Sequence, residues 1–284
     1  MIVDFHTHVF PPEIIARREE YLARDAWFGR LYANPKARMV TAEELVSSMD
    51  ASGVDVSVTF GFGWADSGLC RLANDYTAEA VRAHAGRLVG LAVVNPASPG
   101  AEAEIARCAS LGLSGIGELM PDGQGYSPGA LEVLSPVLEA ARSLGWPILL
   151  HVCEPVGHEY PGKGRSQLDG VVRLAGRFPE ITLILAHWGG GLPFYELMPE
   201  VRAALANTCY DTAASPLLYD DAIFRIAASL APGRILFGTD YPLLGQRRML
   251  ERVRSAGLDE SDLAAVLGGT AARVLGLRAE SAAA

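Results

Sequence analysis

The sequence predicts a single α/β domain of the (β/α)8 TIM-barrel class, and three observations lead to this prediction. Eight short apolar or β-branched runs recur along the 284 residues, each followed by Gly or Pro and then by a helical stretch. The runs are apolar throughout, as expected for parallel strands covered by helices. Candidate polar residues stand at the C-terminal ends of five runs, the edge that carries the active site of a TIM barrel.

The predicted strands are separated by helical segments along the whole chain. They are the runs at residues 2–5, 54–60, 88–94, 115–119, 148–151, 181–187, 208–211 and 235–240. An open, doubly wound sheet is the alternative architecture, but no GxGxxG motif follows the first strand. We therefore expect the strands to close into a barrel.

The helical segments begin with one that Thr41 is expected to cap, because Glu44 three residues later completes a capping box. Further helical stretches are predicted at residues 98–111, 127–144, 165–178, 193–206, 217–231 and 258–277. No low-complexity linker divides the chain. We therefore predict one domain over residues 1–277 and a disordered tail over residues 278–284.

A long insert, residues 9–39, follows the first predicted strand. An insert of this length is expected to serve as a lid over the pocket or as an oligomer contact, for example in a homodimer. The side chains proposed for either role are Trp27, Phe28, Tyr32 and Arg38.

Composition limits the classes of partner. The net charge is -9, from 33 acidic and 24 basic residues, and there is no long basic cluster. This argues against nucleic acid or an anionic membrane as the main partner. The apolar runs are too short to cross a bilayer, and the N-terminus does not resemble a signal peptide. Four cysteines without a CxxC pair are typical of a reduced, cytoplasmic protein.

The first residues that indicate a functional site are the pair His6 and His8. In a strand, residues i and i+2 point to the same side, so both imidazoles can reach one metal ion from the strand end. The pair can also be satisfied by hydrogen bonds in a polar strand end. Its position at the end of the first strand of a barrel favours the metal-binding interpretation.

Four further residues stand at the ends of later predicted strands. A His at the end of an apolar strand is costly to bury without a partner, and His151 and His187 end two successive strands. Asp240, which follows Phe-Gly-Thr, is interpreted as a metal ligand or a base. Glu118 is a candidate metal ligand, hydrogen-bond acceptor for a ligand His, or general base. A barrel would bring these side chains to one point.

These residues resemble the amidohydrolase superfamily, in particular its amidohydrolase-2 branch, which includes aminocarboxymuconate-semialdehyde decarboxylase. The likeness covers nearly the whole chain. It rests on Asp-Phe-His-Thr-His at 4–8, Leu-Leu-His at 149–151, Leu-Ala-His-Trp-Gly-Gly at 185–190 and Phe-Gly-Thr-Asp-Tyr-Pro at 237–242. Residues 267–277 look like the final helix of the branch, with Thr270 where Asn is usual.

The resemblance implies one divalent ion, expected to be Zn. Its ligands would be a water and the side chains of His6, His8, His151 and Asp240. It also implies that His187 lies beside the water as general acid or base.

One departure from the family pattern means that a site with two metal ions is an alternative. Two-metal members usually bridge their ions with a carboxylated Lys on the fourth strand, where this chain has Glu118. This is similar to TatD-type hydrolases, in which a Glu bridges two ions. In that alternative, Glu118 bridges and His151 and His187 bind the second ion.

The ligand set suits more than one reaction. The leading hypothesis is a metal-dependent hydrolase of an amide, ester or lactone of a small carboxylated molecule, using metal-activated water, with His187 or Asp240 moving the proton. The alternative is a lyase that removes the carboxylate of a small cyclic or aromatic acid. A third hypothesis is a ligand-binding barrel without turnover or without metal, as in the related pyrone-dicarboxylate lactonase.

The polar loop after the fifth strand, residues 154–165, bears on the substrate. Lys163 and Arg165 are candidates for binding a substrate carboxylate. Glu154 follows His151 by three residues, a spacing similar to the deaminase branch, where a Glu protonates the substrate. His158 is a candidate for a further polar contact.

Overall fold

The computed structural model describes residues 1–165 and 167–277 as one barrel, so the predicted tail at 278–284 lies outside the described residues. All strand pairs are parallel. The strands are β1 (Val3–His8), β2 (Val56–Phe60), β3 (Leu88–Gly90), β4 (Ile116–Leu119), β5 (Ile148–Leu150), β6 (Leu183–Leu185), β7 (Thr208–Asp211) and β8 (Ile235–Leu236).

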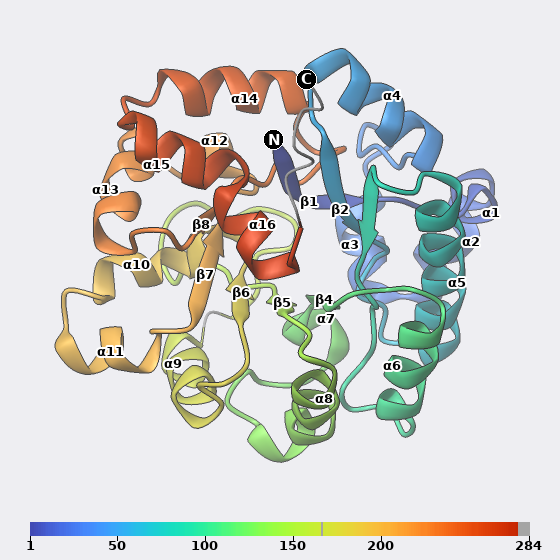
Figure 1. Cartoon of the computed structure of the whole chain (residues 1–284). Helices are drawn as coiled ribbons and strands as arrows, with labels where there is room; N and C mark the ends of the chain where they lie inside the picture. Colours follow the sequence, from blue (N-terminus) through green and yellow to red (C-terminus); the bar gives the residue numbers. More distant parts are fainter. Residues whose placement is uncertain (166, 278–284) are drawn as a thin grey trace.

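The strands follow one another around the barrel in the order of the sequence. Hydrogen-bonded ladders join neighbouring strands from β1 through β3 and from β4 through β8. An isolated bridge between Ala92 and Ile116 connects the chain after β3 to β4, and one between Thr7 and Tyr241 connects β1 to the chain after β8. The strands therefore close on themselves, with helices on the outside (Figure 1). The predicted TIM barrel is confirmed.

The outer helices are amphipathic and cover the barrel. The capping box predicted at Thr41 is present: its hydroxyl accepts from the Glu44 N–H at 3.4 Å, and the Glu44 carboxylate accepts from the Thr41 N–H at 2.9 Å. The outer helices are α4 (Ala42–Ser52), α5 (Ser67–Ala83), α6 (Ala101–Ser110), α8 (Leu131–Leu144), α9 (Leu168–Arg177), α13 (Ala222–Leu230) and α14 (Gln246–Ser255).

Three predicted helices are divided in the structure. The segment 193–206 forms α10 (Leu192–Tyr195) and α11 (Pro199–Ala204), because Pro199 cannot donate a helical hydrogen bond and begins a new helix. The segment 217–231 forms α13 and, before it, α12 (Ser215–Leu218). The segment 258–277 forms α15 (Glu260–Ala264), a π-helical turn over Ala265–Gly269 and α16 (Thr270–Leu275).

Three predicted strands are four residues shorter than expected, and one of them is the run 181–187, which is a strand only over Leu183–Leu185. The run 88–94 is a strand only over Leu88–Gly90, and the run 235–240 only over Ile235–Leu236. After β8 the chain turns away from the ladder, and Asp240 has a left-handed φ of 61° that no regular strand contains. The last residues of the eighth run therefore do not extend the sheet; they form the turn that carries Asp240.

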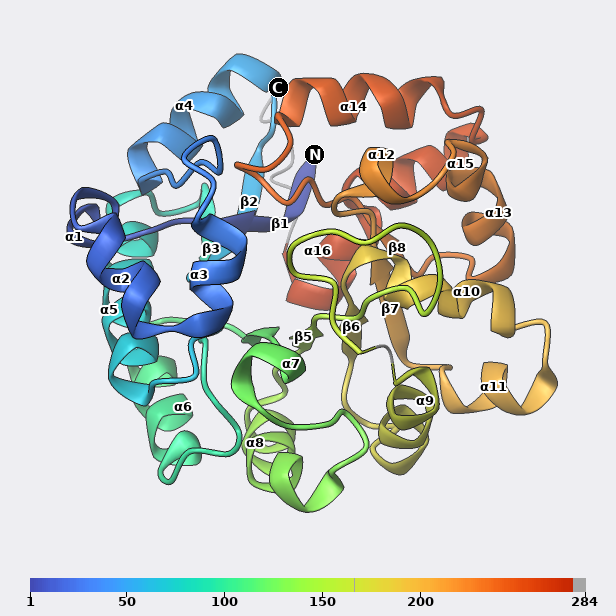
Figure 2. The ribbon, with the colours of Figure 1, turned by 180° about the vertical axis from the view of Figure 1, so that it is seen from behind.

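The insert after β1 folds into three short helices at the C-terminal end of the barrel, and the last of them lies beside α7 (Pro121–Gln124) (Figure 2). They are α1 (Pro12–Ala16), α2 (Arg18–Arg24) and α3 (Ala26–Tyr32). The Asp25 carboxylate caps α3 by accepting from two backbone N–H groups. The ring of Phe28 lies 4.5 Å from that of Tyr32 and 4.5 Å from that of Trp64. Aromatic packing thus holds α3 over the barrel.

The strands are buried on both faces. Ile148 and Leu150 belong to one cluster of buried apolar side chains, whereas Leu149 between them belongs to another that also contains Phe5 and Phe60. This alternation explains why the runs are apolar at every position, since one face packs on helices and the other fills the barrel.

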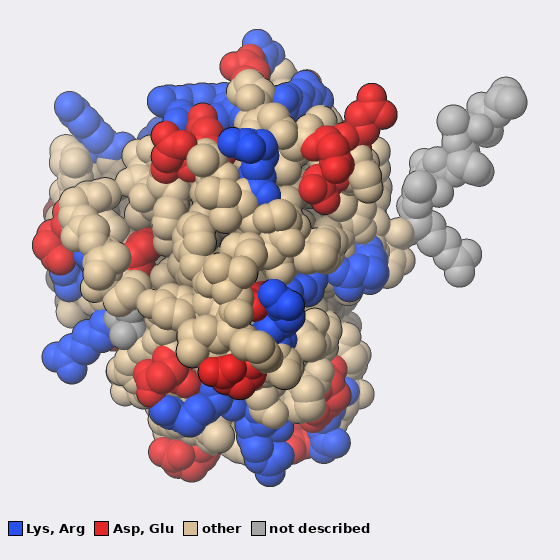
Figure 3. Space-filling model, turned by 90° about the vertical axis from the view of Figure 1, so that its left-hand side faces the viewer, with Lys and Arg blue, Asp and Glu red and all other residues tan. Residues whose placement is uncertain are grey.

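The surface carries no obvious basic region on the side shown in Figure 3, where acidic and basic side chains lie next to one another around a broad uncharged area. In the part of the chain that the structure describes, no helix is long and apolar enough to cross a membrane.

Replacing Glu196 by alanine is expected to destabilise the barrel by about 3 kcal/mol, because the half-buried Arg234 guanidinium and the Tyr210 hydroxyl both lose the carboxylate that they contact. Glu196 is fully buried, accepts from the Tyr210 hydroxyl at 2.6 Å and pairs with Arg234. Urea unfolding measures the change. The control is Asp169→Ala, which removes an exposed pair with Arg173 and should cost less than about 1 kcal/mol. Equal effects would contradict this account.

Candidate metal centre

Six side chains predicted to form a site converge at the C-terminal end of the barrel. Each comes from the end of its strand or from the first residues after it, as the barrel geometry requires. The six are His6 and His8 of β1, Glu118 of β4, His151 after β5, His187 after β6 and Asp240 after β8.

His6 and His8 face each other across the centre. Their Nε2 atoms lie 3.3 Å apart, and both rings pack edge-on against Phe60, with ring centroids at 5.1 Å and 4.7 Å. The register of β1 against β2 shifts between Asp4 and Thr7. The HxH spacing therefore places both imidazoles toward one point, as predicted.

Glu118 lies between two pairs of imidazoles. Its Oε2 is 3.8 Å from Nε2 of His6 and 3.9 Å from Nε2 of His8. Its Oε1 is 2.8 Å from Nδ1 of His151 and 3.6 Å from Nε2 of His187. The two oxygens of one buried carboxylate thus face different halves of the cluster.

Asp240 closes the cluster on the side of β8. Its Oδ1 is 3.3 Å from Nε2 of His8 and 3.8 Å from Nε2 of His6. Its backbone N–H donates to the His6 carbonyl at 2.9 Å, which fixes the left-handed turn against β1. Burial alone would raise the pKa of Asp240, but a hydrogen bond from His8 and the charge of His6 hold it below its usual range.

The atoms that bind metals form three overlapping groups. In each, the nitrogen and oxygen atoms lie within 4.8 Å of one another. The groups are His6, His8 and Glu118; His6, His187 and Asp240; and Glu118, His151 and His187. The structure therefore places His151 with Glu118 and His187, not with the other three ligands that the resemblance implied. The second ring nitrogen of His151, Nε2, lies 3.2 Å from Sγ of Cys153.

The imidazoles and carboxylates of this cluster stabilise each other's charged forms. Burial alone would lower the pKa of His6, but the carboxylates of Asp211 and Glu118 outweigh it and raise this pKa to about 10. Burial would raise the pKa of Glu118, but the neighbouring His151 and His6 hold it well below its usual range. Burial alone would lower the pKa of His187, but a hydrogen bond to Glu118 and the charges of Asp240 and Glu118 together raise it.

A cavity of about 170 Å³ opens onto the cluster. A cavity of ~150 Å³ holds a benzene molecule, so this space suits one ring with small substituents. Among the described residues that line it, Arg38 is the only Lys or Arg. Apart from Arg38, Tyr32 and the cluster itself, the walls are formed by Leu31, Ala37, Phe62, Met120, Pro161, Pro242 and Leu243.

The insert supplies part of this wall. Leu31 and Tyr32 at the end of α3, and Ala37 and Arg38 after it, line the cavity. Phe28 packs behind Tyr32. This arrangement supports the lid interpretation of residues 9–39, while the oligomer contact stays a prediction.

Of the four loop residues predicted to bind substrate, none lines the central cavity. The Nζ of Lys163 donates to the carbonyls of residues 156–158 at 3.1–3.3 Å, so its charge holds the loop together. Glu154 is buried and accepts from the Tyr160 hydroxyl at 2.9 Å. His158 and Arg165 are exposed. The loop folds back on itself, and sequence spacing alone did not reveal this.

Asp211 is a site residue that the sequence analysis missed. It is fully buried, and its Oδ2 lies 2.7 Å from Nδ1 of His6. Its Oδ1 accepts from the backbone N–H of His187 at 2.9 Å. Asp211 is the last residue of a predicted strand, as are several of the candidate site residues. Its position at a strand end was therefore the feature of the sequence that could have identified it.

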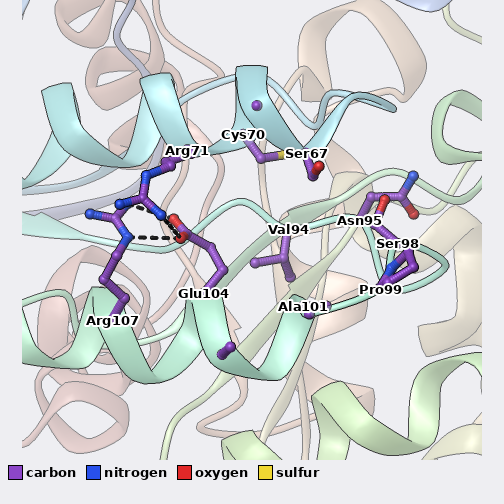
Figure 4. A pocket seen from close by; sticks show the side chains of 13 residues that line it. Ser67, Cys70, Arg71, Val94, Asn95, Ser98, Pro99, Ala101, Glu104 and Arg107 are labelled. Carbon is purple, nitrogen blue, oxygen red and sulfur yellow. Dashed lines mark hydrogen bonds and ion pairs between the residues drawn. The ribbon is translucent and has the colours of Figure 1, made fainter.

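A larger cavity, about 300 Å³, lies away from the cluster between α5 and α6 (Figure 4). Its charged residues already pair with one another: Glu104 lies 2.7 Å from Arg107 and 3.8 Å from Arg71. None of the predicted site residues lines it. We therefore place the candidate site at the smaller, central cavity.

The chain belongs to the amidohydrolase family, whose sequence pattern it matches over residues 3–277. This confirms the resemblance drawn from the His and Asp motifs. No curated protein matches the chain.

Solved structures with the same fold include two decarboxylases. The 5-carboxyvanillate decarboxylase of Sphingomonas paucimobilis is 22% identical, with a TM-score of 0.78, covering 98% of this chain and 99% of that chain. The dihydroxybenzoic acid decarboxylase of Polaromonas sp. JS666, with bound manganese and 2-nitroresorcinol, is 19% identical, with a TM-score of 0.77 and 98% of both chains covered.

A third similar structure is a putative amidohydrolase from Staphylococcus aureus. It is 20% identical, with a TM-score of 0.74, covering 97% of this chain and 99% of that chain. At these identities the likeness establishes the barrel fold, and the activities named are those of the neighbours.

Proposed function

We propose that this protein is a metal-dependent, non-oxidative decarboxylase of a small aromatic acid. The observation that carries the proposal is the central cavity, in which a buried cluster of imidazoles and carboxylates meets a largely apolar wall and one arginine. Similar structures that are decarboxylases of aromatic acids support it.

The donor set fits a divalent metal. Imidazole and carboxylate ligands suit Zn and Mn alike, so the donor chemistry does not choose between them. Mn is bound in the Polaromonas neighbour, and Zn was expected from the sequence. The buried carboxylate of Glu118 and the half-buried carboxylate of Asp240 lie among imidazoles whose pKa values are raised. A cation would satisfy the carboxylates that those protons now satisfy.

The residues proposed to hold one ion are His6, His8, Glu118 and Asp240. The Nε2 atoms of the two histidines lie 3.3 Å apart, and each lies 3.3–3.9 Å from one oxygen of Glu118 and one of Asp240. His151 then orients Glu118 through the 2.8 Å contact of its Nδ1. The group of Glu118 Oε1, His151 and His187 has the composition of a second site. Metal analysis of the purified protein distinguishes one bound ion per chain from two.

When bound, the metal supplies Lewis-acid stabilisation of negative charge on the substrate. The apolar wall binds the aromatic ring, and Arg38 binds an anionic group at the mouth of the cavity. Decarboxylation replaces the carboxylate by one proton, which must reach the ring carbon as carbon dioxide leaves. His187 lines the cavity, and its raised pKa favours the protonated imidazole that can deliver this proton.

Hydrolysis of an amide, ester or lactone uses similar ligands, and the cavity wall favours decarboxylation over it. An apolar wall offers few hydrogen-bond partners for the polar groups of such substrates. It suits a reaction that turns a charged carboxylate into neutral carbon dioxide.

The test is a substrate panel with metal-loaded protein. The acids are 2,6-dihydroxybenzoate and 5-carboxyvanillate, and the comparison compounds are amides, esters and lactones of similar size. We expect carbon dioxide and the decarboxylated phenol from at least one acid. Turnover confined to the amides, esters or lactones would contradict the proposal and favour the hydrolase.

Arg38→Met is expected to raise KM for the acid substrate by roughly 10- to 100-fold with a smaller change in kcat, because one charge-assisted contact is lost. Arg38 lines the cavity beside the Tyr241 ring, at 5.9 Å. Steady-state kinetics measures both constants. Arg30→Met is the matched control, because Arg30 belongs to the same insert but stacks on Trp27 outside the cavity. An equal rise in KM in both variants would contradict this role.

Metal affinity is expected to rise with pH. In the metal-free protein His6 has a pKa of about 10, so it carries a proton at neutral pH that the ion must displace. Each displaced proton weakens binding about tenfold for every pH unit below that pKa. Titration with Mn²⁺ between about pH 6 and 9 should show this slope. An affinity independent of pH would contradict the protonation described here.

A further inference from the structure

Asp211, the last residue of β7, makes three hydrogen bonds inside the site. Its Oδ2 lies 2.7 Å from Nδ1 of His6. Its Oδ1 accepts from the backbone N–H groups of His187 at 2.9 Å and Ala213 at 3.0 Å. The side chain is fully buried. One carboxylate therefore contacts both β1 and the turn after β6.

The first contact determines which nitrogen of His6 carries a proton. An ionised carboxylate only accepts hydrogen bonds, so Nδ1 of His6 must donate. In the neutral ring, Nε2 then carries the lone pair. Nε2 is the atom that faces His8 and Glu118. A carboxylate on one ring nitrogen commonly orients an imidazole whose other nitrogen binds a metal.

The second contact, from the His187 N–H to Asp211, stabilises a backbone conformation that is unfavourable for residues with side chains. His187 and Trp188 have left-handed φ values of 56° and 59°, and the following glycines 189–191 are left-handed as well. Such a conformation is unfavourable for every residue with a side chain. The bond from the His187 N–H to Asp211 and the 2.7 Å bond from Trp188 Nε1 to Ser215 hold this turn in place.

We propose that Asp211 is a positioning residue that fixes the tautomer of His6 and the backbone of His187 at the same time. This inference rests on the proposed function, in which His6 binds the metal ion. Asp211 itself does not line the cavity, so it acts through the two histidines and not on the substrate.

Asp211→Asn separates these roles. Two backbone N–H groups share Oδ1, so the amide oxygen must stay on that side to avoid facing two donors with its own NH2. The amide nitrogen then faces Nδ1 of His6, which must accept. The neutral ring is left with its proton on Nε2, where the lone pair is needed. The backbone contacts survive, and the metal site is impaired.

The experiment uses the full chain loaded with Zn²⁺ and labelled with ¹⁵N at its six histidines. In the wild type we expect His6 to bear its proton on Nδ1 and none on Nε2. In Asp211→Asn we expect Zn²⁺ affinity, measured by competition with a chelator, to fall about 10- to 100-fold. Circular dichroism and thermal unfolding establish whether the variant is folded.

Asp25→Asn is the matched control. Asp25 is also buried and accepts from the backbone N–H groups of Trp27, Phe28 and Ala65, but it contacts no histidine. It should keep the wild-type Zn²⁺ affinity. A loss of affinity equal to that of Asp211→Asn would mean that any buried carboxylate of this kind matters, and would overturn the inference.

Two further results would overturn it: Zn²⁺ bound through Nδ1 of His6 in the wild type, or unchanged affinity in folded Asp211→Asn. If that variant does not fold, the wild-type ¹⁵N spectrum alone decides. Absence of Zn²⁺ binding by the wild type would contradict the proposed metal centre itself. Retained affinity in the variant would contradict only the role of Asp211.

Discussion

Asp240→Asn will lower the rate of decarboxylation at least ~10³-fold while the barrel stays folded. The carboxylate is proposed to bind the ion, and its Oδ1 lies 3.3 Å from Nε2 of His8. Asparagine keeps the shape of the side chain but removes the charge that balances the imidazoles. The substitution removes a metal ligand and a nearby charge together. We therefore expect a larger fall in rate than on loss of a single general acid or base, which typically lowers the rate about 10²- to 10⁴-fold.

Single-turnover assays with metal-loaded protein measure this effect, and thermal unfolding monitors the fold. Asp122→Asn is the control, because Asp122 lies in α7 at the same end of the barrel but outside the central cavity. A rate within tenfold of wild type for Asp240→Asn would show that the chemistry does not depend on this cluster.

Glu118→Gln is expected to have the second large effect, on metal content. Both carboxylate oxygens face imidazoles, Oε1 at 2.8 Å from His151 and Oε2 at 3.8 Å from His6. A neutral amide presents an NH2 group to one of these pairs and cannot balance their charge. We expect bound metal to fall from at least one ion per chain to less than about a tenth of that after dialysis.

Elemental analysis measures the ion count, with Glu154→Gln as the control. Glu154 is a buried glutamate at the same end of the barrel, but it hydrogen-bonds Tyr160 and lies outside the cavity. Full metal content in Glu118→Gln would contradict the central position assigned to Glu118. A fall from two ions to one would assign Glu118 to only one of two sites.

Much of the fold could be predicted because strand ends in a barrel share one edge. His6 and His8, His151, His187 and Asp240 are distant in sequence, yet each follows an apolar run. Parallel closure then brings them together without any knowledge of side-chain contacts. The lengths of the runs were less informative, because the run that ends at Asp240 leaves the ladder after Leu236.

What the sequence could not provide was orientation. His151 faces Glu118 and Cys153, and not the histidines of β1. That difference depends on side-chain rotation. Lys163 illustrates the same limit. The side chain of a loop lysine can reach a substrate or the backbone carbonyls of its own loop, and only the folded structure shows that Lys163 contacts the carbonyls.

Asp211 was missed for a related reason. Its strand is one of the eight predicted, but an acidic residue at a strand end has many structural roles, such as capping a helix. Its meaning depends on the 2.7 Å contact with His6, more than 200 positions away in sequence.

The walls of the cavity favour a different reaction from the one expected from the sequence. Ligand types alone are compatible with hydrolysis and decarboxylation, and the sequence favoured hydrolysis. The cavity adds an apolar wall with Phe62, Met120 and Leu243 and a single arginine, Arg38. Shape and polarity of the wall, rather than the identity of the ligands, therefore favour an aromatic acid.

The most direct test of a metal-dependent decarboxylase is turnover, in D2O, of the aromatic acid that the substrate panel identifies, by metal-loaded and metal-depleted protein. The account predicts carbon dioxide and a product with one deuterium on the carbon that carried the carboxylate, formed only by the metal-loaded protein. Undiminished turnover after metal removal, or carbon dioxide released without deuterium at that carbon, would contradict it.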